Sequence, residues 1–142
     1  MEILITIQSA RREFYVERLE NKLDHCPYDI VWTVPSVCFD AYEERAKRLV
    51  LGVDGEMPMK PVQLNYALNY AKINGYDYLV TMDDDLVKTL KLDQDKKRKT
   101  IQLTEYIDEA VNLLHNSDYY LAGTCSTSVA IWLANKVKNY GH

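Results

Sequence analysis

The sequence predicts an α/β domain, a three-layer α/β/α sandwich around a mainly parallel, Rossmann-like sheet. Two observations lead to this prediction. Short apolar runs alternate along the chain with segments whose apolar residues recur at helical spacing, which is typical of parallel sheets with helical crossovers. The first run, residues 2–8, is apolar almost throughout, as expected for a strand that is covered on both faces. The length of 142 residues predicts one domain over residues 1–142.

The first half of the chain is expected to contain two strands and three helices. Ser9 and Asp40 are placed to cap the first two helices, because their side-chain oxygens can accept N–H groups that a helix start leaves free. Gly52 is expected to end the second helix, and Pro61 to begin the third after a proline-containing loop. The predicted elements are strands at residues 2–8 and 28–34 and helices at about residues 9–24, 40–51 and 61–73.

The second half begins with a strand that ends in three aspartates. A short helical segment and a wholly polar loop are expected to follow it, and then a helix that Thr104 caps. A further strand and a last helix, capped by Ser128, complete the prediction. The corresponding ranges are residues 78–82, 86–92, 93–100, 104–116, 119–124 and 128 onward.

Composition and charge exclude several classes of protein. The net charge of −4 gives no general attraction to nucleic acid or to an anionic membrane. No apolar run approaches the roughly 20 residues of a membrane span, and the start of the chain lacks the basic and apolar regions of a secretion signal. The three cysteines follow no metal-binding spacing and are typical of free thiols in a reducing compartment. The sequence therefore predicts a cytoplasmic protein that has no membrane partner.

The chain is organised around residues 76–86, Tyr-Asp-Tyr-Leu-Val-Thr-Met-Asp-Asp-Asp-Leu. The first part suits a buried strand, but the carboxylates of Asp83, Asp84 and Asp85 repel one another and are costly to bury unpaired. Such a strand end needs a cation, and a divalent metal that carries a phosphate is the natural candidate. The alternative is an ordinary solvated acidic turn.

The topology favours the metal–phosphate interpretation. Ligands of parallel α/β sheets bind outside the carboxyl ends of the strands. The three aspartates lie at one carboxyl end, and Ser9, Arg11 and Arg12 follow another. Acidic groups for a metal and arginines for an anion are therefore expected at the same edge of the sheet.

The stretch from Gly55 to Asp85 resembles the donor-binding half of GT-A fold glycosyltransferases, and the resemblance covers roughly residues 1–125. In this family a helix precedes a strand that ends in a D-x-D motif. The corresponding order here is Lys-Pro-Val-Gln-Leu-Asn-Tyr-Ala-Leu at residues 60–68, then Gly-Tyr-Asp-Tyr-Leu-Val-Thr-Met-Asp-Asp-Asp at residues 75–85. The D-x-D motif alone is weakly specific. Its position after this helix, glycine and apolar strand makes it more specific.

The resemblance implies transfer of a sugar from a UDP- or GDP-sugar donor with Mn²⁺ or Mg²⁺. It implies that Asp83 and Asp85 form the metal site: Asp85 would ligate the metal that bridges the diphosphate, and Asp83 would contact the ribose or the water shell of the metal. Asp84 is counted with the donor-binding residues, although one interpretation has its side chain pointing away and capping the next turn. The expected donor-binding residues are Ser9, Arg11, Arg12, Lys60, Gln63, Asn65, Asp83 and Asp84.

Several alternatives stay open. Each arginine, and likewise Lys60, Gln63 and Asn65, could be an ordinary surface or structural residue. The segment after Asp85 is short for an acceptor-binding half, so a nucleotide-binding or interaction module without catalysis is one alternative. A second is a haloacid-dehalogenase-like phosphatase with Asp83 as nucleophile and Asp85 as acid/base. The acceptor is unknown; DNA could contact the basic run at residues 96–99, although a solvated loop is the commoner outcome. The sequence indicates no general base and no oligomeric state.

Overall fold

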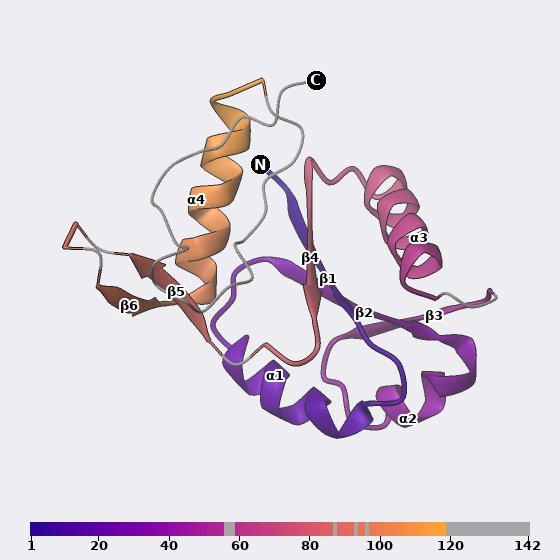
Figure 1. Cartoon of the computed structure of the whole chain (residues 1–142). Coiled ribbons are helices and arrows are strands. Elements are labelled where there is room, and N and C mark those ends of the chain that lie inside the picture. Colours follow the sequence, from indigo (N-terminus) through magenta and orange to yellow (C-terminus); the bar gives the residue numbers. More distant parts are fainter. Residues whose placement is uncertain (56–58, 87, 93, 96, 119–142) are drawn as a thin grey trace. The chain divides into compact units, whose positions relative to one another are not determined.

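The computed structural model describes residues 1–55, 59–86, 88–92, 94–95 and 97–118 (Figure 1). The chain divides into two compact units, Met1–Leu86 and Val87–His142, and each is described by itself. The strand expected at residues 119–124 and the helix expected from Ser128 lie outside the described residues. Within the described part, no helix is both long and apolar enough to cross a membrane.

The first unit contains a parallel sheet, which confirms the predicted α/β class. Its described strands follow the order β3-β2-β1-β4, and every neighbouring pair is parallel. Successive strands step in one direction from β1 to β3, whereas β4 lies on the other side of β1, so the strand order reverses between β1 and β4. This layout is compatible with a Rossmann-like fold. The strands are β1 (Ile3–Gln8), β2 (Asp29–Pro35), β3 (Leu49–Val53) and β4 (Tyr78–Asp83).

Helices cover both faces of this sheet (Figure 1). On one face, Leu4 and Val31 pack with Ala71 of helix α3 (Met59–Ile73) in an apolar core. On the opposite face, the buried Trp32 contacts the ring of Tyr42 from helix α2 (Phe39–Glu43), with 5.9 Å between ring centroids. The alternation of side chains along each strand therefore separates the α3 layer from the α2 layer.

The prediction of the second helix is largely wrong. Helix α2 ends at Glu43, and residues expected to complete it form β3 instead. The apolar residues of this stretch suit helical and strand spacing equally well, so the periodicity alone could not separate the two. Gly52 lies inside β3 rather than at a helix end, and a Cβ atom there would lie 3.3 Å from the ring of Phe39.

The other helices of the first unit lie close to their predicted positions, but their starts and caps differ from the prediction. Val16, Leu19 and Leu23 are buried, as their spacing predicts. However, a 3-10 turn, η1 (Glu13–Tyr15), precedes α1 (Val16–Lys22), and Ser9 caps neither of them. Helix α3 starts at Met59, two residues before Pro61, and stops as predicted at Gly75, which has a φ of 77°.

The strand that carries the aspartates is less covered than predicted. The side chains of β4 are half-buried or exposed, because β4 is an outer strand of the described sheet.

The second unit contains an antiparallel ribbon and a helix. Strands β5 (Thr89–Leu92) and β6 (Arg98–Ile101) pair where a helical segment and a loop were expected. Helix α4 (Leu103–His115) matches the predicted range and buries Ile107 and Val111. The predicted cap is wrong, because Thr104 lies inside the helix and Gln102 is the N-cap residue. The ribbon places Lys91 directly opposite Lys99, and Lys91 forms an ion pair with Glu109 of α4. Glu109 therefore balances the charge of Lys91, the residue that faces Lys99 across the ribbon.

Glu20 joins α1, β2 and the segment before β3. Its carboxylate is buried and accepts hydrogen bonds from Trp32 Nε1 at 3.0 Å and from the backbone N–H groups of Lys47 at 2.7 Å and Arg48 at 3.2 Å. A buried carboxylate of this kind is stable only with several donors. These hydrogen bonds tie the segment before β3 to helix α1.

We expect Glu20→Gln to lower the free energy of unfolding by about 2–3 kcal/mol, because it removes a charged acceptor and turns an NH₂ group toward N–H donors. Glu17→Gln is the matched control, since Glu17 lies on the same helix and is exposed. Urea unfolding of both variants measures the difference. Equal stability of the two would contradict the structural role of Glu20.

Candidate functional site

A pocket of about 460 Å³ opens at the carboxyl ends of β1 and β4. It lies where the strand order reverses, which is the position at which open parallel sheets bind ligands. All of its lining residues belong to the first unit. They are Gln8, Ser9, Ala10, Arg12, Met59, Lys60, Gln63, Asp83, Asp84 and Asp85.

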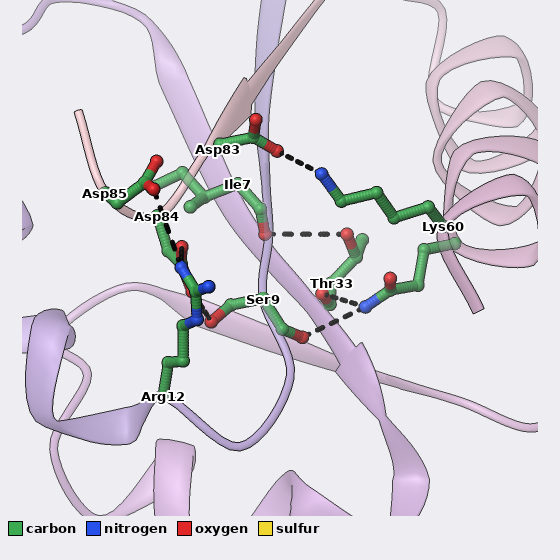
Figure 2. A network of polar contacts seen from close by, with 9 residues as sticks. Ile7, Ser9, Arg12, Thr33, Lys60, Asp83, Asp84 and Asp85 are labelled. Carbon is green, nitrogen blue, oxygen red and sulfur yellow. Dashed lines mark hydrogen bonds and ion pairs between the residues drawn. The ribbon is translucent and has the colours of Figure 1, made fainter. Parts of the chain in front are cut away.

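The first two aspartates contact opposite layers of the fold (Figure 2). Asp83 is the last residue of β4 and shares a face with Leu79, which packs toward α3; its carboxylate lies 2.8 Å from Lys60 Nζ of that helix. Asp84 comes next and contacts Ser9 and Arg12, on the side of α2. The two-residue period of a strand accounts for this separation.

Asp84 points into the protein, so the interpretation that it points away is wrong. Asp84 as a whole residue is 4% exposed, whereas the side chains of Asp83 and Asp85 are 60% and 58% exposed. Ser9 Oγ donates a hydrogen bond to Asp84 Oδ2, and Arg12 Nη1 lies 3.2 Å from Asp84 Oδ1. The middle carboxylate is thus the structural member of the three, and the outer two are open to the pocket.

A directed chain of hydrogen bonds supports Asp84. A carboxylate accepts only, so the hydroxyl proton of Ser9 is committed to Asp84, and the Tyr42 hydroxyl must donate to Ser9 Oγ. The backbone N–H of Arg12 in turn donates to Tyr42 Oη over 3.0 Å. Burial raises the pKa of Tyr42, which keeps its proton in place. Tyr42 is absent from the predicted site, because its pattern indicates only the apolar face of a helix.

Gln63 is buried, which excludes the alternative that it is a surface residue. Its Nε2 donates to the carbonyl oxygens of Ser9 at 3.0 Å and Thr33 at 2.8 Å. It therefore ties the start of α3 to the carboxyl ends of β1 and β2. Gln63 lines the pocket, but its amide N–H groups are used by the backbone.

Two cations face the three carboxylates. Arg12 Nη1 lies 3.2 Å from Asp84 and 3.6 Å from Asp85, and the charge of Asp84 is the main cause that raises the pKa of Arg12. The hydrogen bond to Asp83 raises the pKa of Lys60. Both cations are therefore protonated at neutral pH, and this group of side chains retains one net negative charge.

The structure places six of the eight expected donor-binding residues, and the expected metal ligand Asp85, around this pocket. Arg11 and Asn65 are exposed and lie outside its lining. Arg11 has a left-handed backbone with a φ of 56°, which a non-glycine residue adopts at a cost of about 1 kcal/mol. Of the two arginines that the sequence offers, only Arg12 reaches the acids in the described structure.

The fit of a divalent metal depends on the outer carboxylates. Among the described residues, no three His, Cys, Asp or Glu side chains converge in a way that could hold a metal ion by themselves. Mg²⁺ and similar cations are commonly held by one or two carboxylates plus the phosphates of a substrate. The exposed oxygens of Asp83 and Asp85 match that second mode, in which the ligand completes the coordination.

No protein-family model, curated protein or solved structure matches this chain. The fold and the pocket define the class: an α/β domain with a mixed-charge pocket at the switch point of a parallel sheet.

We expect Tyr42→Phe to destabilise the fold by about 1–2 kcal/mol, because Ser9 loses its donor while still holding Asp84. Tyr66→Phe, on the exposed side of α3, is the control. A double-mutant cycle with Ser9→Ala, measured by urea unfolding, should show coupling between the two hydroxyls; additive effects would contradict the chain.

The same hydroxyl predicts a pH dependence. Because burial raises the pKa of folded Tyr42, the unfolded state ionises first, at a pH of about 10. The stability advantage of the wild type over Tyr42→Phe should be complete below that pH and shrink as the pH rises through the higher, folded pKa. Unfolding measured from pH 8 to 11 checks the direction, and an advantage that grows with pH would contradict it.

Proposed function

We propose that this protein is a metal-dependent glycosyltransferase that moves a sugar from a UDP- or GDP-sugar to an acceptor. One observation carries the proposal: Asp83 and Asp85 open into a switch-point pocket beside Arg12 and Lys60. Carboxylates suit a hard divalent cation, and guanidinium and ammonium groups suit phosphate oxygens. A metal–diphosphate is the ligand that uses both kinds of group, and the pocket volume of about 460 Å³ is in the range of small-ligand sites.

Each residue has a distinct part in this proposal. Asp85 would hold the metal ion, and Asp83 would contact the ribose or the water shell of the metal. Arg12 and Lys60 pair with phosphate oxygens, while Asp84 holds Arg12 in place. The metal supplies Lewis-acid assistance to the departure of the nucleoside diphosphate.

A GT-A architecture is the finer proposal for the fold. It is supported by the order of α3, the Gly75 turn and the parallel strand β4, which ends at the acidic triplet. Lys60 and Gln63, in the first turns of α3, line the pocket as a donor-binding helix should.

Donor binding is tested by thermal shift with UDP, GDP and their sugars, with and without Mn²⁺. A ligand at 100 times its Kd stabilises a protein by about 2.7 kcal/mol, so we expect a rise in Tm of several degrees when nucleotide and metal are both present. Asp83→Asn and Asp85→Asn should each abolish the rise. Asp24→Asn, an exposed aspartate after α1, is the control. If no nucleotide stabilises the protein in Mn²⁺, the proposal fails.

Two further outcomes would replace the proposal with another function. Metal-dependent nucleotide binding without any turnover of the nucleotide sugar would indicate a binding module. Hydrolysis of p-nitrophenyl phosphate that is lost in Asp83→Asn would indicate a phosphatase with Asp83 as nucleophile.

A further inference from the structure

The pocket carries its own counter-ions. Lys60 Nζ lies 2.8 Å from Asp83, and Arg12 Nη1 lies 3.6 Å from Asp85, so both outer carboxylates already have a cation beside them. A metal that binds Asp83 and Asp85 must therefore displace these side chains or lie next to them. A phosphate that binds Arg12 and Lys60 draws these side chains away from the aspartates, and it is then repelled by the unpaired carboxylates.

The ion pairs of Lys60 and Arg12 with the aspartates differ in how easily they can be replaced by contacts with a ligand. The side chains of Lys60 and Asp83 are 70% and 60% exposed, and an ion pair of this kind is weak because water screens both charges. Arg12 has one buried partner, Asp84, at 3.2 Å and one exposed partner, Asp85, at 3.6 Å. Asp84 can therefore keep the guanidinium in the pocket while the contact with Asp85 opens.

Arg12 is also positioned through its backbone. Its N–H donates to Tyr42, and the left-handed Arg11 directly precedes it. An arginine restrained in this way loses less conformational entropy when it binds an anion than a free one does.

We propose that Arg12 and Lys60 are exchangeable counter-ions that make the binding of a divalent metal and of a diphosphate interdependent. Metal alone meets two resident cations, and diphosphate alone meets three carboxylates. When both enter, Asp83 and Asp85 would turn to the metal, and Arg12 and Lys60 would turn to the phosphates. This inference rests on the metal–diphosphate part of the proposed function and adds the coupling between the two ligands.

The coupling is measured with Mn²⁺ and inorganic pyrophosphate, without any sugar donor. Mn²⁺ binding is followed by electron paramagnetic resonance, and pyrophosphate binding by calorimetry. Each ligand should bind the wild type at least about tenfold more tightly when the other is present, and the two factors should agree, because coupling is reciprocal. Mn²⁺ and pyrophosphate also associate in solution, but this is identical for every variant, so differences between variants report on the protein.

Lys60→Met separates a counter-ion from an ordinary phosphate-binding lysine. Removing the charge beside Asp83 should strengthen the binding of Mn²⁺ alone by about three- to tenfold and reduce the coupling with pyrophosphate. An ordinary phosphate ligand would leave the binding of Mn²⁺ alone unchanged. Lys60 is exposed, so the variant should fold, and Lys72→Met, at the other end of α3, is the matched control.

The outcomes distinguish this inference from the proposed function. If Mn²⁺ and pyrophosphate bind independently, or Lys60→Met leaves the affinity for Mn²⁺ alone unchanged, the counter-ion inference is overturned while donor binding can stand. If neither ligand binds the wild type or Lys60→Met, alone or together, the proposed metal–diphosphate site itself fails. Coupling with the expected response of Lys60→Met supports the inference even if no nucleotide sugar is turned over.

Discussion

The pocket depends on the burial of one charge, the carboxylate of Asp84. Removing a carboxylate from water costs several kcal/mol unless donors and a counter-charge replace the water. Ser9 and Arg12 provide both, and Tyr42 orients the Ser9 hydroxyl. These groups come from the end of β4, the loop after β1 and helix α2, so meeting the needs of one carboxylate brings three separate segments to one edge of the sheet.

That arrangement follows from two geometric rules acting together. Because β1 and β4 pair in parallel, their carboxyl ends lie side by side at the point where the strand order reverses. The alternation along β4 then directs Asp83 toward α3 and Asp84 toward the α2 layer. One acidic triplet thereby contacts both helical layers, and Gln63 ties α3 to the ends of β1 and β2 below it.

The sequence predicts the location of the pocket better than the parts played by its residues. The rule for carboxyl ends of parallel strands is enough to bring Ser9 and Arg12 to the aspartates. Which aspartate is buried depends on the face that β4 presents to each layer, and that is a tertiary property. Tyr42 and Gln63 need the packed helices before their hydrogen bonds exist. Strand β3 is missed because its apolar residues are equally consistent with a helical stripe.

Arg12 and Lys60 change which ligand the three aspartates indicate. From the sequence, three adjacent carboxylates require a cation, and a metal is the natural supplier. In the fold, Arg12 and Lys60 supply two charges, so acidity alone no longer requires a metal. A metal is now favoured by the exposure of the Asp83 and Asp85 carboxylates, because their oxygens are accessible and their ion pairs with Lys60 and Arg12 are exposed to solvent. A free diphosphate would add negative charge to a pocket that is already negative. A diphosphate with its metal adds little net charge, and it is therefore the form in which the nucleotide proposed above is expected to bind at this edge of the sheet.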